Sequence, residues 1–388
     1  MKILILGGGS GDVGRDVARI LLRGNRSLDL LTVTARNMNA ANDFVSNLDD
    51  NRVTPVRLDV TDKSQMIELM RKHDLIINVI GPFDIFGINI MKAAVEAKVN
   101  YIDICDDIQP TLEALLLDSN AKKAGIFLLL SMGWFPGISN IRAKQLSDQM
   151  EKVDEIVTAW VAGKKAAEEK PSSGIAGTDH YIKALTGMIT TFRNGKMVKI
   201  PAYQKGIQLQ FPEPLGLYTC YQLEHPEPIT LPKFIPGVKT ASNLGSLYPA
   251  SRNKSIRRIT RAIDFKILSR SFVSKFLSMQ AQSKKKINYP VMNGSYIACI
   301  GKKDGKNGQL RFSATNTCIT TAEATSQPLA CAVLLAISGN KIKPGVHLPE
   351  TSIKIEDLNK IGKKLKLPFF TKAIEETIWS QEVNSILK

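Results

Sequence analysis

Short apolar runs alternate with helical patterns along the first third of the chain. Residues 2–6 form an apolar run, and glycines follow it before apolar residues at helical spacing begin at Val13. Five more strand-like runs follow, at residues 28–34, 53–60, 75–80, 99–104 and 126–131. Helical patterns separate these runs, and the last helical pattern covers residues 111–124. Strands separated by helices form a parallel sheet with right-handed connections, so this part is predicted to be a doubly wound α/β domain.

The pattern changes after Pro136-Gly137. Residues 153–162 and 205–211 alternate between apolar and polar positions, which is typical of antiparallel strands. Prolines punctuate residues 212–236 and predict an irregular, extended stretch, whereas residues 322–338 form a strongly apolar helix. A hairpin is predicted from residues 295–301 and 309–314.

These patterns divide the chain into three parts. Residues 1–138 form the first α/β domain, and residues 139–320 form an inserted α+β domain. Residues 321–388 are predicted to be a helical segment that packs back on the first domain.

A glycine motif stands between the first strand and the first helix. Gly9-Ser10-Gly11-Asp12-Val13-Gly14 has the spacing GxGxxG. The first glycine permits a tight turn, the second lets the backbone approach a pyrophosphate, and the third allows close packing of helix and strand. The helix N-terminus then attracts phosphate. The motif predicts a Rossmann dinucleotide site; the alternative is a glycine-rich turn without a ligand.

The end of the second strand indicates which dinucleotide binds. A site for NAD usually has Asp or Glu there to bind the ribose hydroxyls. This chain has Arg36 and Asn37 instead. A guanidinium group forms bidentate hydrogen bonds with a 2′-phosphate, so Arg36 predicts NADP(H), unless it is a solvated surface residue.

Later strand ends supply further candidates for cofactor binding. Asp59 and Val60 follow the third strand and are predicted to lie beside the adenine. Gly81 and Pro82 follow the fourth strand, where ligands of such sheets bind, and are predicted near the nicotinamide ribose. Both pairs are also compatible with ordinary turns.

Several segments together resemble the saccharopine dehydrogenase-like oxidoreductases. Besides the glycine motif, the segments are Ala35-Arg36, residues 78–83, 93–97, 100–103, 133–140 and 345–350. The resemblance implies a Rossmann domain, a second domain whose sheet often forms a homodimer, and NADP-linked hydride transfer. Saccharopine reductases carry an acidic residue where this chain has Phe135, and a cysteine near the strand that here ends with Trp160-Val161-Ala162-Gly163. These departures predict a divergent member with another substrate.

Hydride transfer requires little from the protein beyond orientation and a proton donor. Tyr101 and Asp103, near the end of the fifth strand, are the candidate catalytic residues, although a strand residue and a helix cap would look the same. Trp134 and Phe135 are candidates for lining the substrate site or for core packing. Asp179 and His180 are candidate substrate contacts. The scattered histidines and cysteines show no metal-ligand spacing, so no metal is predicted.

The net charge of +16 is unevenly distributed. Residues 1–140 carry 15 basic and 17 acidic residues, so the excess of cations lies in the second half. Eleven Lys and Arg lie within residues 252–286, where apolar residues also recur at helical spacing. Such a helix binds anionic membranes or nucleic acid, but a helix that covers a core with a solvated cationic face is the favoured interpretation, and no nucleic-acid fold is recognisable.

Two functions follow. The favoured one is an NADP-dependent oxidoreductase for a small, anionic substrate with a C=N or C=O group. The alternative is a non-catalytic NADP(H)-binding protein that docks on a partner or an anionic membrane through its basic helix. Five scattered cysteines and the lack of a long apolar run favour a reduced, cytoplasmic setting.

Overall fold

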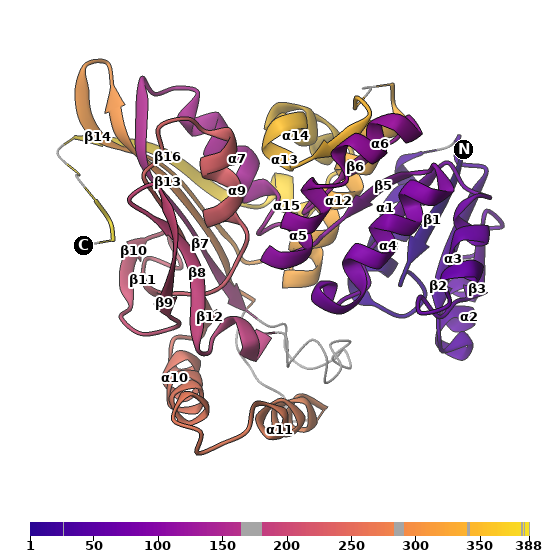
Figure 1. Cartoon of the computed structure of the whole chain (residues 1–388), viewed down its shortest axis with the longest axis horizontal. Coiled ribbons are helices and arrows are strands. Elements are labelled where there is room, and N and C mark those ends of the chain that lie inside the picture. Colours follow the sequence, from indigo (N-terminus) through magenta and orange to yellow (C-terminus); the bar gives the residue numbers. More distant parts are fainter. Residues whose placement is uncertain are drawn as a thin grey trace. The chain divides into compact units, whose positions relative to one another are not determined.

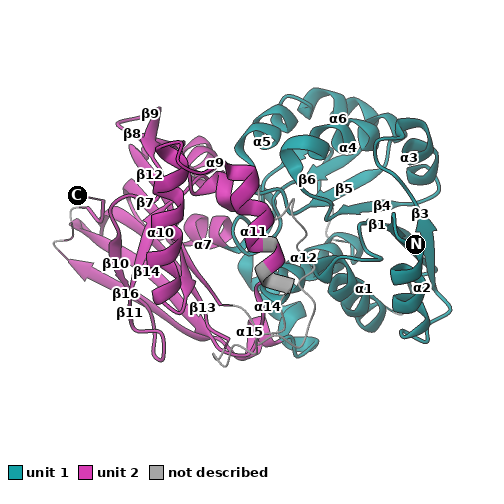
Figure 2. Cartoon of the chain, turned by 90° about the horizontal axis from the view of Figure 1, so that it is seen from below, with its two compact units in different colours: residues 1–138, 322–367 teal, residues 139–321, 368–388 magenta. Residues whose placement is uncertain are grey.

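The computed structural model describes residues 1–25, 27–163, 181–282, 291–339, 342–381, 383 and 385–387. The chain forms two compact units, which Figure 2 shows in different colours. Unit 1 contains residues 1–138 and 322–367, and unit 2 contains residues 139–321 and 368–388.

Unit 1 is built on a seven-stranded parallel sheet with the order β15-β6-β5-β4-β1-β2-β3. Its strands are β1 (Lys2–Leu6), β2 (Leu30–Ala35), β3 (Val53–Arg57), β4 (Leu75–Asn78), β5 (Asn100–Asp103), β6 (Phe127–Leu129) and β15 (Gly345–His347). The chain order reverses on either side of β1, and ligands of open α/β sheets bind at such a reversal. The predicted doubly wound sheet is confirmed.

Helices cover both faces of this sheet, with α3, α4 and α6 on one face and α1 and α2 on the other (Figure 2). The helices of unit 1 are α1 (Asp12–Gly24), α2 (Met38–Ser46), α3 (Lys63–Met70), α4 (Phe83–Ala97), α5 (Ile108–Leu115), α6 (Asp118–Ala124), α12 (Thr321–Ile337), α13 (Pro349–Ser352) and α14 (Ile355–Lys364). The single helix predicted at residues 111–124 is wrong, because the helix is interrupted at Leu116 and Leu117 and becomes α5 and α6.

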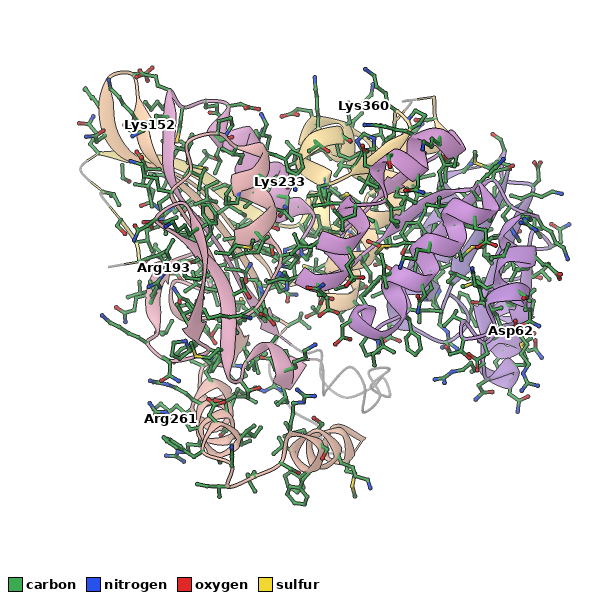
Figure 3. The ribbon with its side chains drawn as sticks, viewed as in Figure 1. Asp62, Lys152, Arg193, Lys233, Arg261 and Lys360 are labelled. Atoms are coloured by element: carbon green, nitrogen blue, oxygen red, sulfur yellow. The ribbon has the colours of Figure 1, made fainter. Side chains whose placement is uncertain are left out.

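Sequence features account for these elements locally. The side chains of Val17 and Leu21 on α1 are fully buried, and Asp12 and Arg23 lie at the ends of the helix where their charges suit its dipole. Helix α3 begins after Asp62, whose carboxylate accepts the N–H of Gln65 at 3.0 Å. Figure 3 labels Asp62 in this capping position.

Unit 2 contains a mixed sheet whose main path is β10-β11-β12-β7-β13-β14-β16, with β8 paired to β12 and β9. Its strands are β7 (Lys152–Gly163), β8 (Met188–Arg193), β9 (Lys196–Pro201), β10 (Ile207–Gln210), β11 (Leu217–Gln222), β12 (Thr240–Tyr248), β13 (Asn293–Lys303), β14 (Lys306–Asn316) and β16 (Ile374–Gln381). Its helices are α7 (Ile138–Ser147), α9 (Glu227–Phe234), α10 (Ser251–Asp264), α11 (Arg270–Gln282) and α15 (Pro368–Thr371). Figure 1 shows how these elements follow one another.

The C-terminal segment differs from the prediction. Residues up to Leu367 belong to unit 1, but residues 368–388 belong to unit 2. The reason is that β16 pairs antiparallel with β14, and Arg311 binds Glu376 across the two strands at 2.7 Å. The helical return to the first domain therefore ends at Leu367.

Two other regions differ from the sequence pattern. The proline-rich residues 212–236 contain strand β11 and helix α9, because Pro226 and Pro228 occupy the start of the helix, where proline is tolerated. The basic region is divided into α10 and α11. Among the described residues, no helix is both long and apolar enough to cross a membrane.

Candidate functional site

The turn between β1 and α1 is closed by its own backbone. The N–H of Gly9 donates to the carbonyl of Thr34 at 3.0 Å, and that of Gly11 donates to Gly7 at 3.3 Å. A Cβ on Gly14 would lie 2.7 Å from the Cα of Gly8, so α1 approaches the turn through glycine alone. A Cβ on Gly11 would meet only the oxygen of Gly7, at 3.4 Å. Gly11 therefore marks the open side of the turn.

The residues after Gly9 form the candidate phosphate cradle. Ser10 is exposed, and Asp12 and Val13 are half-buried at the start of α1. The first N–H groups of a helix have no acceptor within it and form an anion site with the helix dipole. Gly11 is the residue before α1, and no side chain caps the helix there. The cradle therefore has the backbone geometry that a pyrophosphate requires.

Two glycine variants separate folding from cofactor binding. Gly14→Ala is expected to lower the free energy of unfolding by about 1–3 kcal/mol, because its Cβ would press on backbone atoms. Gly11 has φ −88° and ψ 144°, which any residue adopts, so Gly11→Ala is expected to cost less than about 1 kcal/mol of stability. Its Cβ stands where phosphate approaches, and NADP⁺ affinity should fall at least tenfold. Urea denaturation measures the stability of each variant, and calorimetry measures its NADP⁺ affinity. If Gly11→Ala and Gly14→Ala changed stability and affinity to the same extent, the assignment of Gly11 to the phosphate site would be contradicted.

The candidate 2′-phosphate site lies after β2. Arg36 and Asn37 are both exposed, and the side-chain oxygen of Asn37 accepts the N–H of Asn39 at 3.1 Å to begin α2. Hydrogen bonds from Thr61, and to a smaller extent the charge of Arg36, hold the pKa of Asp59 below its usual value. Asn37 and Asp59 thus have local structural partners, whereas Arg36 is an exposed cation at the strand end. Val60 is half-buried beside Asp59.

Arg15 is a second cation near this turn, and the sequence analysis missed it. Its guanidinium donates to the carbonyl of Gly9 at 2.9 Å and to that of Ala40 at 2.8 Å, and it lies over the ring of Phe44. Arg15 therefore ties the glycine turn to α2, and it orients the two segments that flank Arg36. Its position directly after the last glycine was the available signal.

The loop after β4 lies at the same edge of the sheet. Gly81 is exposed and Pro82 is half-buried, and their predicted contact with the nicotinamide ribose stays a prediction. Asn78 ends β4, and its oxygen accepts the N–H of Ile80 at 3.0 Å, which fixes the start of this loop.

Tyr101 and Asp103, the predicted catalytic pair, lie in a fully buried network. Asn78 donates to the hydroxyl of Tyr101, which donates to Asp103, both at 2.9 Å. The other oxygen of Asp103 accepts the N–H groups of Cys105 at 3.0 Å and Ser131 at 2.7 Å. The network joins the ends of β4, β5 and β6, so the geometry favours a positioning role for both residues over the predicted contact with substrate.

Burial controls the titration of this network. It raises the pKa of Asp103 to about 6, against the opposing effect of the hydrogen bonds from Ser131, Cys105 and Tyr101. Burial, followed by the charge of Asp103, also raises the pKa of Tyr101 well above its usual value. Tyr101 therefore keeps its proton at neutral pH.

Trp134 and Phe135 lie in a tight turn. The N–H of Gly133 donates to Pro136 at 3.0 Å, and the two aromatic rings meet edge to face at 5.2 Å. Trp134 is buried, which favours core packing over the predicted substrate contact, whereas Phe135 is partly exposed.

The other predicted substrate contacts cannot be placed in the structure. Asp179 and His180 lie outside the described residues. Within the described ranges, no group of three His, Cys, Asp or Glu side chains is arranged to hold a metal ion.

Comparison with known proteins identifies the family. Residues 3–129 match the model of the saccharopine dehydrogenase NADP binding domain. The fold resembles that of apo saccharopine dehydrogenase (L-Glu forming) from Saccharomyces cerevisiae, with a TM-score of 0.67 over 97% of this chain and 99% of that one, at 16% identity. Residues 3–129 therefore form a saccharopine dehydrogenase NADP binding domain. The first unit thus carries an NADP-binding domain, as predicted from the sequence.

Curated relatives of this saccharopine dehydrogenase-like protein match only in part. Saccharopine dehydrogenase [NADP(+), L-glutamate-forming] from Schizosaccharomyces pombe is 25% identical over 206 residues, which is 51% of this chain and 43% of the relative. The protein of that name from Pyricularia oryzae is 30% identical over 142 residues, or 37% of this chain and 29% of the relative. A lipid droplet localized protein from Caenorhabditis elegans is 24% identical over 140 residues, or 34% of this chain and 33% of the relative. Each match spans less than half of the relative's length.

Unit 2 contains a buried polar cluster that the sequence analysis missed. Glu227 is fully buried and accepts hydrogen bonds from Ser139 at 2.9 Å and Asn243 at 3.3 Å. Its other oxygen lies 2.6 Å from Nδ1 of His225. A carboxylate at Nδ1 fixes the orientation of the imidazole ring. His225 and Glu227 are two residues apart, but only the fold brings Ser139 and Asn243 to them.

Proposed function

We propose that this protein is an NADP-dependent oxidoreductase that transfers hydride to or from a small, amino-acid-derived substrate with a C=N or C=O group. The main support is the glycine turn, which is open at Gly11 and packs at Gly9 against Ala35, the residue before the exposed Arg36. It lies in the region that matches the NADP binding domain. The bound nicotinamide supplies the hydride chemistry. The chain supplies the anion cradle, the cation for the 2′-phosphate, and the buried network that fixes the loops after β4, β5 and β6.

The substrate that we propose is anionic and is not saccharopine. Residues 141–388 carry a net charge of +18, and a field of this sign attracts anions. Phe135 stands where the resembling reductases carry an acidic residue, so a proton donor expected at that position is missing. An oxo acid or an imine formed from an amino acid fits these two features.

The test follows the absorbance of NADPH. The full chain is mixed with NADPH and a panel of 2-oxo acids, each with and without amines, and with NADP⁺ and saccharopine for the reverse direction. We expect turnover with at least one oxo acid or imine, and its loss at low cofactor concentration in Gly11→Ala. A preparation that binds NADP⁺ but oxidises no NADPH with any mixture would contradict the catalytic proposal and favour the non-catalytic NADP(H)-binding alternative.

We also propose that the protein acts as a homodimer, as the resemblance implies, and that it works in the cytoplasm, where its five cysteines stay reduced. Sedimentation velocity of the full chain measures its oligomeric state, and a monomer at micromolar concentration would contradict the proposed homodimer.

A further inference from the structure

Helix α10 is firmly attached to unit 2. Asn253 is buried and holds both backbone groups of Leu247 on β12, with distances of 2.9 Å, and it accepts the hydroxyl of Tyr203 at 2.8 Å. Ile256 packs in the same hydrophobic cluster as Tyr203 and Leu185. The other side of α10 does not contribute to this cluster, so the helix presents a fixed outer face (Figure 1).

The apolar residues that follow do not cover a core, contrary to the sequence-based interpretation. Phe265 and Ile267 are 76% and 74% exposed. On α11, Phe272, Phe276 and Met279 are 59%, 50% and 66% exposed. Within the described part of the chain, the exposed aromatic side chains are Phe265, Phe272 and Phe276. We call Phe265, Ile267, Phe272, Phe276 and Met279 together the apolar patch.

The patch on α11 occupies one side of the helix. Phe272, Phe276 and Met279 are four and three residues apart, which places them on one face. The rings of Phe272 and Phe276 stack with centroids 6.5 Å apart and planes 9° apart. Val273 and Ser274, on the opposite side, are buried. The helix therefore buries one side within the molecule and exposes its more hydrophobic side.

Cations lie before and between the residues of the apolar patch along the chain. The exposed ones are Lys254, Arg258, Arg261, Lys266, Arg270 and Lys275, and Figure 3 shows Arg261 extending outward from α10. Asp264 is the single acidic residue between residues 251 and 282, and its carboxylate accepts the N–H of Gly187 at 2.8 Å. The surface is thus strongly positive around an apolar centre.

This combination identifies the class of partner. Without a partner, five large apolar side chains would stay in contact with water, which is unfavourable. A second copy of the chain would bring two sets of cations together, and like charges repel. A nucleic acid would satisfy the cations and stack on the rings, but it offers nothing to Ile267 and Met279. An anionic membrane satisfies both groups, because its head groups attract Lys and Arg while apolar side chains enter the interface.

We propose that residues 251–279 form a peripheral docking surface for an anionic lipid membrane. The apolar patch enters the interface, and the cations around it bind the acidic head groups. The surface lies in unit 2 and contains none of the residues of the cofactor cradle, so docking is independent of NADP(H) binding.

Vesicle sedimentation of the full chain tests this inference. The vesicles are phosphatidylcholine alone, or phosphatidylcholine with phosphatidylserine as the minor component, at low and high salt. We expect the chain to pellet with the anionic vesicles and to be released by high salt. Reversing two cations in Arg258→Glu/Arg261→Glu should weaken binding at least roughly 25-fold, since each cation near such a surface contributes about fivefold. Phe272→Ser/Phe276→Ser should weaken it at least tenfold.

Matched variants control for general effects of charge and hydrophobicity. Met188→Ser/Met197→Ser removes two exposed apolar residues elsewhere in unit 2, and Lys360→Glu/Lys363→Glu reverses two exposed cations on α14. Both should bind vesicles like the wild type, and all four variants should keep its NADP⁺ affinity and thermal transition.

Three results would overturn the inference. The first is equal binding to neutral and anionic vesicles, or none to either. The second is self-association without lipid that Phe272→Ser/Phe276→Ser abolishes, which would assign the patch to a second copy. The third is tight RNA binding that Arg258→Glu/Arg261→Glu abolishes while vesicle binding stays unchanged.

Discussion

Replacing Arg36 with alanine is expected to weaken NADP⁺ binding by about 1.5–3 kcal/mol, which is the usual contribution of a hydrogen bond to a charged group. Arg36 is exposed at the end of β2, where a guanidinium can hold a 2′-phosphate with two hydrogen bonds. NAD⁺ has no such phosphate, so its affinity should hardly change, and the preference for NADP⁺ should largely disappear. Calorimetric titration of both cofactors into wild type and Arg36→Ala measures this difference.

Arg71→Ala provides the control for this experiment. Arg71 is exposed after the end of α3, so its loss changes the net charge equally without altering the strand end. Both affinities should stay at the wild-type values. If Arg36→Ala weakens NADP⁺ and NAD⁺ by the same factor, the 2′-phosphate is held elsewhere, and Arg15 becomes the residue to replace next.

Replacing Asp103 with asparagine is expected to change how stability depends on pH. The pKa of Asp103 is about 6 in the folded chain and close to 3.9 in an unfolded one. The folded state therefore keeps a proton that the unfolded state releases, so the contribution of Asp103 to the stability of the wild type falls as the pH rises from 4 to 7. The loss that Asp103 contributes is about 2 kcal/mol, and the variant should lack it. Urea denaturation at several pH values measures both proteins.

The control for this prediction is Tyr101→Phe, which removes one hydrogen bond to Asp103 but leaves its carboxyl group buried. Because the hydrogen bond from Tyr101 lowers the pKa of Asp103, its loss should move the fall in stability to higher pH, whereas Asp103→Asn should remove the fall. Parallel stability curves for the wild type and Asp103→Asn would show that Asp103 does not titrate between pH 4 and 7.

Local signals were sufficient to predict six of the seven strands of unit 1, all except β15. Each strand is a short apolar run and each helix has its own periodicity, and the glycine motif lies where a strand meets a helix. Even so, residues 111–124 were predicted as one helix, because nothing in the apolar pattern at Leu116 and Leu117 indicates the break. The burial of Tyr101 could not be predicted either, since it depends on β4 and β6 as much as on its own strand.

Long-range contacts limited the prediction of unit 2. Strand β16 joins the sheet through β14, more than fifty residues earlier in the chain, and Ser139 reaches Glu227 across 88 residues. Helical spacing in the basic region indicated correctly that one side of the helix is apolar. It did not indicate which apolar residues would be covered, because that depends on where α10 ends and the chain turns.

The division of the chain has a practical consequence. The backbone crosses between the units after residues 138, 321 and 367, so neither unit corresponds to a continuous stretch that could be expressed by itself. Deleting residues 368–388 would remove β16 and leave β14 with a row of unsatisfied backbone groups, and such an open edge recruits strands from other molecules. A tag or fusion partner at that end must therefore leave the last strand free to pair.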